Sequence, residues 1–195
     1  VPIRYAEVDE EIDTAEDFRL WDETRKRLET QLGRKIELEI EPGRYVVAES
    51  GYLVCRICAI KKMGDNLFYL LDAGFNTLAR PILYGAYHPI SIVPGSGSSG
   101  DRSEQDVVVG GPLCESGDIF TQSEGGFVQQ RRLPRAEVGD LLVIECAGAY
   151  ASVMASNYNS KPLPPEVLIE DQRCRLIRRR QTVDDMLRNE QNLGQ

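Results

Sequence analysis

The stretch PLCESGDIF, from Pro112 to Phe120, holds residues of this chain that are well suited to chemistry. A thiol at Cys114 stands directly beside a carboxylate at Glu115, between two apolar segments. A cysteine in such a place can be a buried hydrophobic residue, half of a disulfide, a metal ligand or a reacting group. A free thiol has a pKa of about 8.5, so it is mostly protonated at neutral pH and can donate a proton.

A second candidate stretch is EPGR, residues 41–44, at the end of an expected strand. It combines the carboxylate of Glu41 with a Pro-Gly bend and a cation. Gly43 permits close approach of the backbone to an anion, and Arg44 offers a forked guanidinium. The alternative interpretation is an ordinary turn with a surface ion pair.

Two more candidates are the stretches ARPILYGAYH (79–88) and GAYASVM (148–154). Arg80 and Tyr84 are four positions apart, so they share one face if the segment is helical. Tyr150 directly follows an expected strand and a pair of small residues. The alternatives are a pair on a helix surface for the first two residues, and a core aromatic with a solvated hydroxyl for Tyr150.

The elements that must position these groups begin with a helix and a strand. Thr14 predicts a helix N-cap with an acidic third position at Asp17, and Gly33 predicts the stop. Apolar residues between them keep helical spacing. The segment KIELEIE, 35–41, alternates polar and apolar residues and predicts a strand. A helix followed by a strand is the order of elements found in an α/β unit.

After Arg44 the chain consists of short β-like segments separated by turn-forming residues, which predicts a β-sandwich or open barrel. The stretch 94–105 is rich in glycine and serine and predicts a flexible loop. The basic run RCRLIRRR predicts a strand with one solvated face. Thr182 is expected to cap a short helix near the end of the chain. The β-like segments are YLVCRICAIKK, NLFYLLDAG, PISIV, DVVVGG, DLLVIECAG, EVLIE and RCRLIRR.

The composition of the chain argues against several classes of function. A net charge of −8 argues against non-specific binding to nucleic acid, which depends on neutralising phosphates. No apolar run approaches the about 20 residues of a spanning helix, so we expect no membrane association. The first residues have neither a basic start nor an apolar core, so they do not resemble a signal peptide. Because the sequence lacks an initiator Met, we expect Val1 to be an internal position of a longer protein.

The five cysteines predict reduced thiols in the cytoplasm, because their number is odd and no secretory signal precedes them. Cys55 and Cys58 have the spacing of a redox or zinc site. They lie within one expected strand, however, where they would point to opposite faces. His88, the only histidine, is distant in sequence. Small buried hydrophobic residues are therefore the better interpretation, and we predict no metal site.

In this order, EPGR, RP-x-x-YGAYH, GPLCESGD and GAY with a following YN-x-x-P resemble the C-terminal portion of the diaminopimelate decarboxylases. These are enzymes with an alanine-racemase-like α/β barrel followed by a β domain, and they use pyridoxal 5′-phosphate. The resemblance implies a mainly β chain, with residues 49–195 as the C-terminal β-sandwich or barrel domain. Residues 1–48 would be the last helix-strand part of the preceding TIM-like barrel.

The resemblance also implies roles in cofactor binding. Glu41 resembles the carboxylate that faces the pyridine nitrogen. Gly43 and Arg44 resemble the phosphate-side backbone and a substrate contact. Tyr150 resembles a tyrosine that touches both cofactor and substrate. The lysine that would hold the cofactor lies outside these residues in the family, so this chain alone is expected to be inactive.

For the substrate, Arg80 and Tyr84 resemble groups that hold a carboxylate. Cys114 resembles the cysteine that enters the partner subunit's site and returns a proton to the α-carbon after decarboxylation. Glu115 resembles the group that binds the far amino end of diaminopimelate. A homodimer with shared active sites is therefore implied.

The implied activity is conversion of meso-2,6-diaminopimelate to L-lysine and CO2, a step of lysine biosynthesis. The carboxylate in CES favours this substrate, because ornithine-type relatives differ at Glu115. Two alternatives stay open: a related decarboxylase of ornithine or lysine, and a non-catalytic regulatory homologue.

Overall fold

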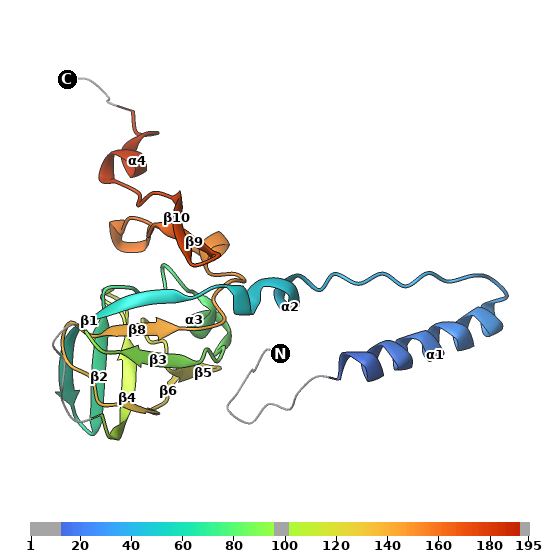
Figure 1. Ribbon diagram of the computed structural model, residues 1–195, viewed down its shortest axis with the longest axis horizontal. Coiled ribbons are helices and arrows are strands. Elements are labelled where there is room, and N and C mark those ends of the chain that lie inside the picture. Colours follow the sequence, from blue (N-terminus) through green and yellow to red (C-terminus); the bar gives the residue numbers. More distant parts are fainter. Residues whose placement is uncertain (1–12, 96–101, 192–195) are drawn as a thin grey trace.

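A six-stranded curled sheet forms the body of the molecule in the computed structural model, which describes residues 13–95 and 102–191 (Figure 1). Neighbouring strands are antiparallel except β2 and β4, which are parallel. The outer strands β3 and β7 contact each other, so the sheet is a nearly closed barrel. This confirms the mainly β prediction. The spatial order is β3 (Ile90–Val93), β8 (Leu141–Ile144), β1 (Leu53–Met63), β2 (Asn66–Leu71), β4 (Glu104–Gly110) and β7 (Arg131–Pro134).

The core lies inside this barrel and follows from alternation along the strands. In β1, Cys55 and Ile57 are buried, whereas Arg56 and Cys58 are exposed. The prediction that Cys55 and Cys58 occupy opposite faces is confirmed, but Cys58 is not a buried residue. The other strands contribute Tyr69, Leu71, Val107, Val109, Leu133, Leu142 and Ile144 to the same core.

Arg131 connects the two outer strands where the barrel nearly closes. It belongs to β7, and its guanidinium donates a hydrogen bond to the carbonyl oxygen of His88, just before β3. The same guanidinium lies 3.9 Å from the ring centroid of Tyr87, a cation–π contact. These two contacts of Arg131 therefore hold His88 and its neighbours beside the sheet.

The N-terminal helix α1 (Thr14–Leu32) stands off the barrel (Figure 1). Its N-cap is Asp13 and not Thr14, because the Asp13 carboxylate accepts from the backbone N–H groups of Ala15 and Glu16. Gly33 ends the helix in the left-handed conformation, as predicted. The strand predicted at 35–41 is not formed, because an extended segment becomes a strand only by pairing, and the described residues offer it no partner.

Short elements follow the extended segment and connect the strands. The helix α2 (Gly43–Val47) and the 3-10 turn η1 (Ala48–Ser50) lead into β1. The helix α3 (Arg80–Tyr84) lies between β2 and β3. A small hairpin, β5 (Gln122–Ser123) and β6 (Phe127–Val128), precedes β7; these three strands had no sequence prediction.

The C-terminal arm consists of the hairpin β9 (Glu166–Glu170) and β10 (Arg173–Arg178), followed by α4 (Val183–Leu187). The strand predicted for the basic run is confirmed, but both of its faces are exposed, because the hairpin joins no larger sheet in the described residues. Thr182 caps α4 in a capping box with Asp185, which confirms that prediction. The 3-10 turns η2 (Ser152–Met154) and η3 (Tyr158–Ser160) connect β8 to this arm.

The expected loop 94–105 lies partly outside the described residues, and its last two residues already belong to β4. All five cysteines lie in the described part and are free thiols. In that same part of the chain, every helix is too short or too polar to cross a membrane.

Candidate functional site

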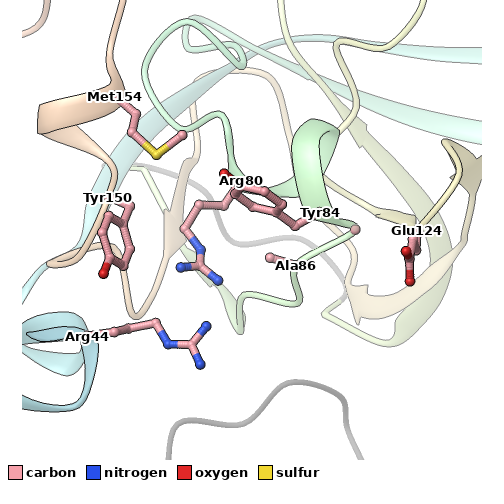
Figure 2. Close-up of a pocket in the computed structure, with 8 residues that line it drawn as sticks. Arg44, Arg80, Tyr84, Ala86, Glu124, Tyr150 and Met154 are labelled. Carbon is pink, nitrogen blue, oxygen red and sulfur yellow. The ribbon is translucent and has the colours of Figure 1, made fainter. Parts of the chain in front are cut away.

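A cavity of about 540 Å³ opens beside α3, between α2 and the loop that follows β8 (Figure 2). It brings together four residues predicted from three separate stretches: Arg44, Arg80, Tyr84 and Tyr150. In Figure 2 the guanidinium groups of Arg44 and Arg80 and the ring of Tyr150 point toward one shared space. The lining is completed by Gly85, Ala86, Glu124 and Met154.

Arg80 is the buried cation of this cavity. It begins α3, where Pro81 suits the first turn, and Gly85 ends the helix in the left-handed conformation. Its side chain is only 9% exposed, and its Nε has no hydrogen-bond partner among the described residues. Its guanidinium lies 5.6 Å from the ring centroid of Tyr150. The alternative of a surface pair with Tyr84 is therefore wrong for Arg80, although Tyr84 itself is exposed.

Tyr150 is held in place by a close approach of two backbone segments. The N–H of Ala147 donates to the carbonyl of Gly51 at 2.8 Å, and that of Gly148 donates to the carbonyl of Ala48 at 2.9 Å. Tyr150 itself has a φ of 59°, a left-handed conformation that is uncommon for a bulky residue. Such strain is frequent at binding sites. Because Tyr150 is 44% exposed, the alternative of a core aromatic is wrong.

This contact also brings the EPGR stretch to Tyr150. The Tyr150 hydroxyl lies 4.0 Å from the point where a Cβ at Gly43 would stand. Gly43 begins α2, so EPGR is the start of a short helix and not the end of a strand. Glu41 is exposed, and it is not among the residues that line the cavity.

The electrostatics of the cavity favour an anion. Burial lowers the pKa of Arg44, and the nearby positive charge of Arg80 lowers it further. Burial likewise lowers the pKa of His88 to about 4, with further lowering by the neighbouring arginines, so His88 is neutral at pH 7. Its Nδ1 therefore carries the hydrogen and donates to the carbonyl of Glu145 at 2.9 Å. Two guanidinium groups in one partly buried space suit a carboxylate or phosphate.

Cys114 and Glu115 belong to a second group of side chains, on the loop between β4 and β5. Both side chains are exposed, so the interpretation of Cys114 as core filler is wrong. Asp118 anchors this loop to the interior of the molecule, because its side chain is buried. Its carboxylate accepts hydrogen bonds from the backbone N–H groups of Leu113 at 2.8 Å and Phe75 at 2.7 Å. Burial raises the pKa of Asp118, and these two hydrogen bonds oppose that rise.

The Glu115 carboxylate has three hydrogen-bond donors. Its Oε1 accepts from the Ser116 hydroxyl at 3.2 Å and from the Gly117 N–H at 3.3 Å, and its Oε2 accepts from the Tyr158 hydroxyl at 3.2 Å. These bonds hold the pKa of Glu115 below its usual range. Sequence reasoning gave no role to Tyr158, Asp118 or Glu124. The YN in the family pattern was a signal for Tyr158, and Asp118 stood in the stretch that held Cys114.

The two groups lie apart on the same chain. Gly117 packs against Ile82 of α3, so the Cys114 loop contacts the helix that also contributes Arg80 and Tyr84 to the cavity. Neither Cys114 nor Glu115 lines that cavity. The described residues thus present a cavity lined by two arginines and a separate, outward-facing thiol and carboxylate.

Comparison with known proteins identifies the family that this chain matches. Residues 44–148 match the family model described as pyridoxal-dependent decarboxylase, C-terminal sheet domain. The diaminopimelate decarboxylase of Buchnera aphidicola subsp. Acyrthosiphon pisum is 53% identical over 188 residues, which are 96% of this chain and 45% of that protein. The chain therefore spans less than half the length of this curated relative.

Solved structures give the same result. A crystal structure of diaminopimelate decarboxylase matches with a TM-score of 0.86 and 48% identity, over 97% of this chain and 45% of that one. The structure of diaminopimelate decarboxylase from Helicobacter pylori complexed with L-lysine matches with a TM-score of 0.74 and 37% identity, over 96% of this chain and 42% of that one.

Proposed function

We propose, because this chain belongs to the pyridoxal-dependent decarboxylases and contains their C-terminal sheet domain, that it is part of an enzyme converting meso-2,6-diaminopimelate to L-lysine and CO2. The observation that carries the proposal is the cavity in which Arg44, Arg80 and Tyr150 meet beside α3. Relatives about half identical to this chain are named diaminopimelate decarboxylase, and one solved relative holds L-lysine, the product of the proposed reaction.

The cavity fits pyridoxal 5′-phosphate and an amino-acid substrate by its charge and its glycine. Gly43 lies beside the Tyr150 hydroxyl, which is 4.0 Å from the point where a Cβ at Gly43 would stand. Arg44 and the unpartnered Nε of Arg80 supply donors for phosphate or carboxylate oxygens. When bound, the cofactor supplies an electron-withdrawing ring that stabilises the negative charge left by CO2. We assign cofactor contacts to Gly43, Arg44 and Tyr150, and a substrate carboxylate to Arg80 and Tyr84.

Glu41 is assigned to the cofactor ring on the family pattern alone. Its carboxylate is exposed at the start of α2, next to Gly43 and Arg44 in the sequence. In the complete enzyme, residues 1–48 would join the α/β barrel and residues 49–195 would form the β domain. Glu41 would then lie where the two domains meet.

Cys114 and Glu115 would complete the site of a second copy of the chain. Both groups face outward and lie outside the cavity, which suits side chains that act on a neighbour. The Cys114 thiol would donate its proton to the substrate's α-carbon after CO2 leaves. Glu115 would bind the far ammonium group. The homodimer would therefore have two shared sites, and the five free thiols of each chain suit the reducing cytoplasm.

The complete enzyme with its cofactor tests the function directly. CO2 release is measured with meso-diaminopimelate, L-ornithine and L-lysine. We expect a preference of roughly 10⁴-fold for diaminopimelate, because buried charges left unpaired reject a substrate that lacks the far carboxylate. Equal or better turnover of ornithine or lysine would favour the related basic amino-acid decarboxylases. Absence of turnover with all three would favour a non-catalytic homologue.

Hybrid dimers test the shared site. Cys114→Ala should lower kcat by about 10²–10⁴-fold, the usual contribution of a proton donor, whereas the exposed Cys174→Ala on β10 should leave it unchanged. Cys114→Ala subunits are then mixed with inactive Arg80→Met subunits. One intact site per hybrid dimer should restore activity. If mixing restores nothing, the two groups act within one chain.

A further inference from the structure

Tyr158 connects the Glu115 loop to two other loops. Its hydroxyl donates to Oε2 of Glu115 at 3.2 Å, across 43 positions of sequence. Its ring packs against Phe75 with the ring centroids 4.8 Å apart and the planes tilted by 56°. The phenol is therefore held from its ring side while its hydroxyl reaches the carboxylate.

The loops that carry this pair are tied to each other. The buried Asp118 carboxylate accepts from the backbone of Phe75 and of Leu113, so it holds both the Phe75 loop and the Glu115 loop. The N–H of Ser156 donates to the carbonyl of Asn76 at 2.8 Å, which ties the Tyr158 segment to the Phe75 loop. These contacts close a ring of three loops, and the separation between phenol and carboxylate is set by that ring.

The backbone around Tyr158 is also constrained. Asn159 and Ser160 both have left-handed φ values, 54° and 55°, which non-glycine residues rarely adopt in succession. The Asn157 side chain donates to the carbonyl of Lys161 at 2.9 Å and to Oε1 of Gln181 at 2.5 Å. Such a conformation persists only where surrounding contacts fix it, so the direction of the phenol is well defined.

The two oxygens of Glu115 have different partners. Oε1 accepts from Ser116 and Gly117, which belong to its own loop. Oε2 accepts from the Tyr158 hydroxyl, and a carboxylate oxygen has a second lone pair. The pKa of Glu115 is lowered by these bonds, so the group is ionised at neutral pH. Oε2 is thus a charged acceptor that uses one lone pair for the Tyr158 hydroxyl and can offer its second lone pair to a cation.

We propose that Tyr158 is a positioning residue of the active site, which aims the free lone pair of Glu115 Oε2 at the far ammonium group of the substrate. The inference rests on the proposed function and adds to it a residue that acts through Glu115. Tyr158 itself does not take part in proton transfer to the substrate. Its loss should weaken substrate binding and leave the chemical step nearly intact.

The experiment compares Tyr158→Phe with the wild-type complete holoenzyme. KM for meso-diaminopimelate should rise about fivefold to tenfold, as for loss of one hydrogen bond to a charged group, while kcat changes less than about twofold. In a Glu115→Gln background, Tyr158→Phe should change KM by less than about twofold, because the bond it removes no longer serves an ionised partner. Phe75→Leu should raise KM in the same direction by a smaller factor. The exposed Tyr52→Phe is the matched control and should change neither constant.

An unchanged KM in Tyr158→Phe would overturn the inference, and so would an equal KM effect with and without Glu115. A fall in kcat as large as the rise in KM would also overturn it, since that would mean a general structural role. A wild-type enzyme without activity on meso-diaminopimelate is a separate result: it would overturn the proposed function, and the role of Tyr158 with it.

Discussion

At the scale of single residues, Gly148 decides whether the cavity can form. A Cβ at this position would collide with the carbonyl oxygen of Val47, and it would lie only 2.9 Å from the backbone nitrogen of Gly51. The missing side chain lets the loop after β8 lie directly on the segment after α2. Tyr150 reaches Arg44 and Arg80 because of this contact, so a residue with no functional group of its own determines the binding site.

Gly148→Ala should therefore destabilise the complete protein by about 1–3 kcal/mol, the usual effect of forcing a methyl group into a packed site. Urea denaturation measures the change. Gly110→Ala is the control, because a Cβ there would meet its neighbours at an ordinary 3.4 Å. If both variants unfold at the same urea concentration, the two backbones are not as close as described.

At the scale of elements, the strands that carry alternating apolar residues were predictable, and those defined by their partners were not. The β1 segment was predicted as one continuous run of β-like residues before a turn, and in the structure Cys55 and Ile57 alternate with exposed residues. β5 and β6 have two residues each, too few for a pattern, and exist through pairing with each other. The segment 35–41 shows the opposite case: it has the pattern but no pairing strand in the described residues.

The residues of the candidate site likewise include some that sequence spacing predicts and others that it does not. Arg80 and Tyr84 could be predicted to act together, because four positions on a helix define one face. Their meeting with Arg44 and Tyr150 was implied by the family resemblance only. Tyr158 could not be assigned to Glu115, because loop geometry rather than spacing brings the two together.

Asp140 joins the turn before β8 to both ends of the Gly/Ser-rich loop, and its effect on stability depends on pH. Its buried carboxylate accepts from Arg102 at 2.7 Å, Gly95 at 2.8 Å and Glu137 at 2.9 Å. Burial alone would raise the pKa of Asp140, but these hydrogen bonds outweigh it and lower the pKa to about 2. An unfolded aspartate has a pKa of about 3.9, so the ionised group stabilises the fold above that pH.

Asp140→Asn should lower the free energy of unfolding of the complete protein by about 2 kcal/mol at pH 7. The difference from wild type should shrink as the pH falls from about 4 toward about 2, because the wild-type carboxylate then becomes protonated and loses its advantage. Urea denaturation at pH 7, 4 and 3 gives the comparison. A difference that stays constant over this range would mean that the charge of Asp140 contributes nothing.

At the scale of the whole molecule, the barrel buries its apolar side chains in its interior. By contrast, α1 and the C-terminal arm leave apolar side chains exposed. Phe18 and Trp21 of α1 are each at least half exposed, and so are Ile169 and Leu176 of the β9–β10 hairpin. Figure 1 shows both regions standing off the barrel. Exposed apolar surface of this kind is typical of faces that meet other parts of a protein.

The chain by itself should release no CO2 from meso-diaminopimelate, even with pyridoxal 5′-phosphate added. None of its lysines stands in the lysine motif of the family, and Cys114 and Glu115 lie outside its own cavity. The complete enzyme, assayed under the same conditions, is the reference. Turnover by the 195-residue chain at a comparable rate would show that the reacting groups were assigned wrongly.

The pairing of β1 with β8 has a consequence during synthesis. Residues 53–56 of β1 pair with residues 141–144 of β8, which follow them by more than 80 positions in the described chain. A ribosome adds roughly 5–20 residues per second, so this edge of β1 stays unpaired for on the order of ten seconds while the later strands emerge. An uncovered strand edge can pair with other nascent chains. The order of strands in this barrel thus sets a period in which a chaperone is most useful.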